Sequence, residues 1–193
     1  RLLRAVRQFG SEAFDAVLDR HPFLSAHLDA LLAEMPGEIA WDAGVAWWDG
    51  RIADVETASR GRLPLAALRA EAGLSAASVT AFVAAGLVEE DVRFGTLLAD
   101  LQAPLPHRRP CLELLGRIAG ADAWPTVRPL VDAGLVMPVD ASAPRAEWAF
   151  RVPTPLWDAA RSETVHVDGL ALRPHAGLVP IEALLLPAPF VAR

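Results

Sequence analysis

The chain has 193 residues, enough for one large domain or for two or three small ones. Hydrophobic residues make up 53% of it and charged residues 22%, which supplies a sizeable core and argues against disorder. Its net charge of −6 argues against general binding of nucleic acid through the phosphates. All 18 basic residues are Arg, and the chain contains neither Lys nor Tyr.

The single cysteine and the apolar runs indicate the compartment. Cys111 excludes an internal disulfide and lies among apolar residues, so we expect a small buried hydrophobe in a reducing cytoplasm. The longest apolar run, GLVPIEALLLPAPFVA, is interrupted by Glu182 and three prolines, so we expect no contact with a membrane. We expect no signal peptide. Because the chain begins with Arg1 rather than Met, we expect it to be a piece of a longer protein.

Residues 1–40 have the periodicity of helices. Apolar residues recur at helical spacing in three runs, which end at Gly10, Pro22 and Pro36. We expect these helices to form a lead-in to the units that follow.

Residues 41–105 predict a first winged-helix unit. A short helix ends at Gly73, and Ser75 caps a second helix that Gly86 closes. The following stretch, LVEEDVRFGTLLADL, changes to the period of a strand, with a turn near Gly95. Helix, turn, helix and hairpin are the order of a winged helix.

Residues 106–165 repeat this order and predict a second winged-helix unit. The helix end AGLV occurs twice, at residues 85–88 and 133–136. The stretches LVMPVD and EWAFRVP are typical of strands, and ASAPRA predicts the turn between them. The stretch TPLWDAARSE predicts a closing helix, and residues 166–193 predict a strand and a Pro-rich linker to a following domain. The predicted fold is α+β and mostly helical, a tandem of winged helices behind an N-terminal helical lead-in.

The second helix of each predicted unit is poorly suited to DNA. In the first unit it has no Arg, Lys, Asn or Gln, and the acidic residues 89–91 that follow would repel phosphate. In the second unit it offers Arg128 alone, between Asp122 and Asp132. DNA binding is therefore the alternative function. It would need a basic face assembled from separate arginines, namely Arg60, Arg62, Arg69, Arg108, Arg109 and Arg128.

The sequence predicts no catalytic residue, no metal site and no cofactor site. One cysteine and five histidines do not have zinc-finger spacing. A phosphate-binding loop of the G-x-x-x-x-G-K-[ST] type is impossible without Lys, and no G-x-S-x-G elbow occurs. We therefore do not expect the chain to be an enzyme.

Three tryptophans lie close together in the sequence, at Trp41, Trp47 and Trp48. One interpretation is core packing under the first winged helix, since large aromatic side chains supply much core area. The other is a partner-facing patch, since Trp is favoured at interface hot spots. Both interpretations stay open at this point.

The repeated AGLV helix ends and the tail LRPHAGLVPIEALLLP resemble a known region of some bacterial AAA+ ATPases. This is the winged-helix region before the ATPase domain, as in the group linked to phage-tail-like contractile injection systems. The resemblance covers most of residues 40–193. It implies that ATP and Mg²⁺ bind a domain beyond Arg193 and that this chain holds no cofactor. It also implies a non-catalytic module that recruits a protein partner, contacts its own ATPase domain or positions a homo-oligomer.

Overall fold

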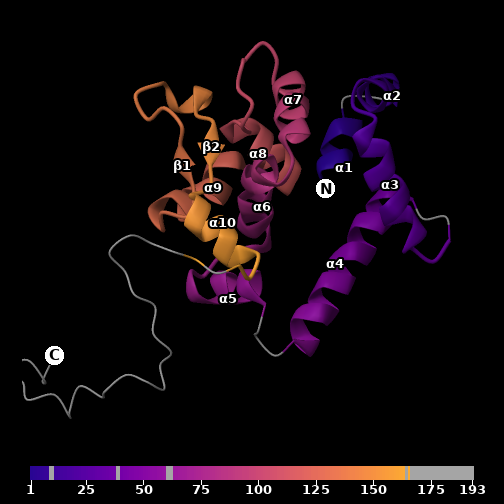
Figure 1. Cartoon of the computed structure of the whole chain (residues 1–193), viewed down its shortest axis with the longest axis horizontal. Coiled ribbons are helices and arrows are strands. Elements are labelled where there is room, and N and C mark those ends of the chain that lie inside the picture. Colours follow the sequence, from indigo (N-terminus) through magenta and orange to yellow (C-terminus); the bar gives the residue numbers. More distant parts are fainter. Residues whose placement is uncertain (9–10, 38–39, 60–62, 164, 166–193) are drawn as a thin grey trace, which may run out of the picture.

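The computed structural model describes residues 1–8, 11–37, 40–59, 63–163 and 165. This part of the chain is mostly helical and holds one small antiparallel sheet (Figure 1), so the prediction of a mostly helical fold is confirmed. The strand and linker predicted for residues 166–193 lie outside the described residues.

Four helices form the N-terminal part of the structure, namely α1 (Leu2–Arg7), α2 (Ser11–Arg20), α3 (Phe23–Ala33) and α4 (Trp41–Ala58). The first three pack around a small core with a residue of α7. Its buried members are Leu3, Val6, Phe14, Val17, Leu24 and Leu97. Pro22 separates α2 from α3, as predicted, because its ring cannot continue a helix.

Helix α6 (Ala76–Glu90) is the centre of the larger core. It packs against α5 (Pro64–Glu71), α7 (Val92–Leu101), α8 (Leu112–Ala119) and α9 (Ala123–Asp132). Ser75 caps α6, as predicted, because its hydroxyl accepts a hydrogen bond from the backbone N–H of Ser78 at 3.0 Å. Small buried side chains let the neighbours approach closely, among them Ala81, Ala84 and Ala85.

The hairpin predicted for the first winged-helix unit is wrong. Gly86 lies inside α6 instead of closing it, and Gly95 lies inside α7 instead of in a turn. The Asp91 carboxylate accepts the backbone N–H of Arg93 at 2.9 Å, so a new helix begins where a strand was predicted. The described residues therefore show no repeat.

The second copy of AGLV ends a helix, as predicted, because the residues that follow it differ from those after the first copy. Gly134 has φ +69° and ends α9, and Gly120 has φ +70° and ends α8. After the second copy comes Pro138, which cannot donate a helical hydrogen bond, whereas the helix formers Glu89 and Glu90 follow the first. The same four residues thus continue one helix and end another.

A hairpin follows α9, as predicted for residues 106–165. Strands β1 (Met137–Pro138) and β2 (Phe150–Arg151) pair antiparallel, with Met137 opposite Arg151. A single bridge joins Cys111 to Ala149, and Cys111 is buried, as predicted. The 3₁₀ turn η1 (Arg145–Glu147) lies in the hairpin loop, and helix α10 (Thr154–Ala160) closes this part of the fold, as predicted.

Three carboxylates at the end of α6 hold three different segments. Glu89 pairs with Arg109 at 2.7 Å. Glu90 accepts the indole N–H of Trp157 in α10 and pairs with Arg161 at 3.0 Å. Asp91 caps α7, and the hydrogen bonds from the Arg93 side chain and backbone lower the pKa of this carboxyl. The acidic run therefore has a role in folding, whatever its effect on phosphate.

Gly86 tests the packing of α10 on α6. A Cβ at this position would lie 2.1 Å from Cζ3 of Trp157, whose side chain is buried. We expect Gly86→Ala to lower the free energy of unfolding by about 1–3 kcal/mol in a urea titration, because overpacking a filled core costs that much.

Gly50 supplies the matched control in another helix. A Cβ there meets no atom within 4 Å, so Gly50→Ala should raise the free energy of unfolding by about 0.5–1 kcal/mol through helix propensity alone. A Gly86→Ala variant as stable as the native chain would contradict the packing argument.

Candidate functional site

None of the described side chains of helix α4 belongs to either of the two cores described above. In Figure 1 it runs along the outside of the structure, from α3 toward α5. Residues 51–58 are exposed, apart from the half-buried Glu56. Two ion pairs tie α4 to the rest of the structure, residues 1–8, 11–30 and 63–163, which we call the body. They join Arg1 to Asp49 at 2.8 Å and Arg69 to Glu56 at 3.1 Å. The connection between α4 and the rest of the chain is therefore mainly polar along its second half.

Exposed apolar side chains gather on α4 and on the end of α3. We call residues 31–37 and 40–58 the arm. Seven large hydrophobic residues are exposed in the described part of the chain, and four of them lie on the arm. These are Leu31 at 40%, Leu32 at 48%, Ile52 at 54% and Val55 at 47%. The remaining three are divided between α7 and the hairpin, so the arm is where apolar exposure concentrates.

The structure places Trp47 and Trp48 on this arm. Their rings meet edge to face with centroids 4.9 Å apart, and both side chains are half-buried. Neither belongs to the two cores described above. The indole N–H of Trp48 is buried and has no hydrogen-bond partner among the described residues. Trp41 begins α4, but its side chain lies outside the described set.

The arginines of the hypothetical basic face are placed apart. Arg108 and Arg109 lie in the loop after α7, whereas Arg69 lies on α5, at the opposite end of the body in Figure 1. Arg128 lies on α9 and pairs with Asp132 of the same helix at 3.3 Å. Arg60 and Arg62 lie outside the described residues.

These arginines also have partners within the chain. Arg109 pairs with Glu89, and Arg69 pairs with Glu56. Arg108 donates hydrogen bonds to the Val92 carbonyl oxygen at 3.3 Å and to Thr96 Oγ1 at 3.4 Å. Binding to phosphate would have to compete with these contacts.

The exposed side of α9 is poorly equipped to contact DNA bases. Pro125 and Pro129 lie one helical turn apart and are both exposed, and neither has a backbone N–H. The one arginine of this helix, Arg128, is already paired with Asp132. The helix therefore presents apolar rings and a compensated charge where a DNA-reading helix presents donors.

Sequence reasoning missed a cation–π cluster at the hairpin. The Arg145 guanidinium lies 4.3 Å from the ring centroid of Trp124 and 5.8 Å from that of Trp148. The Trp148 indole N–H also donates to the Ala143 carbonyl oxygen at 2.8 Å. These contacts hold the hairpin loop against the start of α9. No local pattern could have predicted them, because the residues come from different elements.

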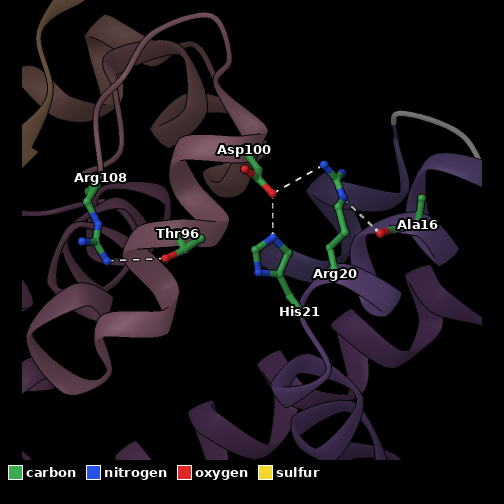
Figure 2. A network of polar contacts seen from close by, with 6 residues as sticks. All are labelled: Ala16, Arg20, His21, Thr96, Asp100 and Arg108. Atoms are coloured by element: carbon green, nitrogen blue, oxygen red, sulfur yellow. Dashed lines mark hydrogen bonds and ion pairs between the residues drawn. The ribbon is translucent and has the colours of Figure 1, made fainter.

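A shallow hollow of about 340 Å³ lies where the α2–α3 corner meets α7, lined by Arg20, His21, Pro22, Phe23, Arg93 and Thr96. Figure 2 shows Arg20 and His21 both pointing at Asp100 of α7. Nε2 of His21 lies 2.9 Å from Oδ2 of Asp100, and Nη1 of Arg20 lies 3.5 Å from the same oxygen. The His21 side chain is only 6% exposed. Because the imidazole is buried, it is not accessible to a substrate. The network instead links the α2–α3 corner to α7, and we call it the clamp.

The charges around this hollow are already balanced. Arg20 shares Asp100 with His21, and Arg93 pairs with Asp91 at 2.5 Å. No three His, Cys, Asp or Glu side chains gather within the described ranges as a metal ion would require. None of the described helices is long and apolar enough to cross a bilayer. No protein family, curated protein or solved structure matches the chain.

Asp100 tests the clamp of Figure 2. We expect Asp100→Ala to lower the free energy of unfolding by about 1–3 kcal/mol, because it leaves the buried His21 nitrogen without its partner. Asp132→Ala is the control, since it breaks an exposed ion pair within one helix and should change stability by about 0.5 kcal/mol or less. If a urea titration gave the two variants the same loss in the free energy of unfolding, the clamp would contribute no more to stability than an exposed ion pair.

Proposed function

We propose that the chain is a non-catalytic protein-interaction module whose contact surface is the arm. The observation that carries this proposal is the concentration of exposed apolar side chains on the arm, outside both cores. Apolar exposure concentrated on one part of a protein is typical of protein contact sites, and Trp is enriched at their energetic centres.

The lack of apolar packing along the second half of α4 supports the same proposal. Most of the stability of a helix in a protein comes from packing of its apolar face, and each internal glycine costs about 1 kcal/mol. Helix α4 includes Gly44 and Gly50, and none of its described side chains belongs to either core. Contact with a partner would supply the packing that its second half lacks.

The body would serve as the scaffold for this arm, and we propose that it contains a single winged-helix unit. The order of α8, α9 and the β1–β2 hairpin supports this assignment, and so does the bridge from Cys111 to Ala149 at the edge of the sheet. The first predicted unit has no hairpin and is not part of the proposal.

DNA binding is the second candidate because winged helices often serve it, and fold does not fix function. The order of helices and hairpin favours it. The paired arginines and the two prolines of α9 oppose it, as does the net charge of −6.

We also propose that the module belongs to a larger bacterial AAA+ ATPase. The support is the resemblance of the AGLV helix ends and the tail, not the geometry of the body. The sequence after Arg193 in the parent gene tests it. A glycine-rich loop with Lys is expected there, and its absence would remove this part of the proposal.

The two candidate functions differ in their affinity for DNA. We expect no change in the fluorescence anisotropy of a labelled random-sequence duplex at low salt, because the described arginines of the hypothetical basic face already have partners within the chain. Tight binding that weakens steeply with added salt would overturn the interaction-module proposal. In that case Arg128→Ala on α9, compared with Arg69→Ala on α5, would show whether α9 makes the contact.

A further inference from the structure

Helix α4 has the apolar spacing of a coiled-coil seam. Val45, Trp48, Ile52 and Val55 follow one another at intervals of three, four and three residues. In heptad terms Val45 and Ile52 occupy a positions, and Trp48 and Val55 occupy d positions. The opposite face carries small, exposed residues, namely Ala46, Gly50, Ala53 and Thr57. The helix therefore has one apolar seam and one small outer face.

This seam is half-covered at its start and open at its end. Val45 and Trp48 are half-buried, whereas Ile52 is 54% and Val55 47% exposed. At the start of α4, a Cβ at Gly44 would lie 3.2 Å from Cε of Met35, so this part of α4 packs near the segment that follows α3.

The body holds α4 by its flank rather than by its seam. Asp49 and Glu56 occupy e positions, and these are the two residues that pair with Arg1 and Arg69. The ion pairs thus fix how α4 is turned, and they leave Ile52 and Val55 facing solvent.

We propose that the open half of the seam pairs in parallel with the same segment of a second copy of this chain. This inference rests on the proposed function, because it names the partner of the arm. In a coiled coil the a and d side chains of one helix pack between those of the other, and the open a and d positions here are Ile52 and Val55. In this register Ile52 meets Ile52 of the second copy, and Val55 meets Val55.

Charge complementarity selects the same register. Arg51 occupies a g position, and in a parallel pair it faces the e position five residues further along the other helix, which is Glu56. Two such pairs form by symmetry. Within the described residues Arg51 has no carboxylate partner, and its guanidinium lies 5.9 Å from the Trp47 ring. Glu56 uses Oε2 for Arg69, so its Oε1 can accept from the second Arg51.

In an antiparallel pair, the e positions of one helix would face the e positions of the other, and the g positions would face the g positions. The e flank carries Asp49 and Glu56, so carboxylates of the two copies would face one another. Like charges at such positions are destabilising. The parallel arrangement replaces this repulsion with two opposite-charge contacts.

The proposed contact between the two copies of α4 is short, so the dimer should be weak. Stable interfaces bury about 1,200–2,000 Å² in total, whereas the open seam consists of about one heptad. We therefore expect reversible, concentration-dependent pairing. In sedimentation-velocity runs of the full 193-residue chain, the mass should rise from monomer toward twice that value with concentration. A chain that stays monomeric at every concentration would overturn the proposal.

A single introduced thiol tests the register directly. Cys111 is the only cysteine of the chain and is buried, so Val55→Cys adds the one accessible thiol. Under mild oxidation we expect this variant to form a disulfide-linked dimer, because parallel pairing brings the two d positions together. Thr57→Cys is the matched control on the opposite, exposed face and should stay largely monomeric. Equal cross-linking of the two variants would overturn the proposed seam.

Two surface variants separate the apolar and charge contributions. Ile52→Ser with Val55→Ser should abolish the rise in mass, and circular dichroism checks that the helix content is kept. Arg51→Glu should weaken association, because it sets a carboxylate against Glu56 of the second copy. Association unchanged by Arg51→Glu would overturn the parallel register. A monomer that does not bind DNA would remove self-pairing only, whereas DNA binding would remove the proposed function as well.

Discussion

The rest of the described body depends on close approach to helix α6. Apart from Phe82 its buried residues are small, so α8 and α9 pack closely against it, and β2 contacts the same helix. Gly86 is the extreme case, because the Trp157 ring of α10 lies where a Cβ would be. The same helix ends in three acidic residues that fix the loop before α8, helix α10 and the start of α7. One helix thus supplies both the apolar centre and the polar attachments of the body.

The described side chains of α4 are not part of the core that packs around α6. Helix α4 is attached through Asp49 and Glu56, and its seam extends past the body with Ile52 and Val55 exposed. Exposed ion pairs contribute little to stability, about 0–1 kcal/mol each, so apolar contact elsewhere is needed to hold the second half of α4. A partner bound to the seam supplies the apolar contact that the body does not provide, and in this way the packing of α4 leads to the proposed function.

Local signals predicted the elements whose causes are local. Ser75 caps α6 and Gly134 ends α9, because a hydroxyl and a positive φ act within one turn. The two AGLV stretches show the limit, because Gly86 packs against Trp157, a contact between residues distant in the sequence that no local pattern reveals. The tryptophans of α4 were singled out from composition. The exposure of Ile52 could not be predicted, because it depends on where the whole helix lies relative to the body.

Amide hydrogen exchange of the native chain, measured at low concentration, tests the division into body and arm most directly. Exchange reports local opening, which is slowest in packed cores and fastest where few apolar contacts hold a helix. The account predicts the slowest exchange in α6 around Phe82 and fast exchange across residues 51–58. Residues 51–58 as strongly protected as α6 in the monomer would contradict it, because α4 would then be packed without any partner.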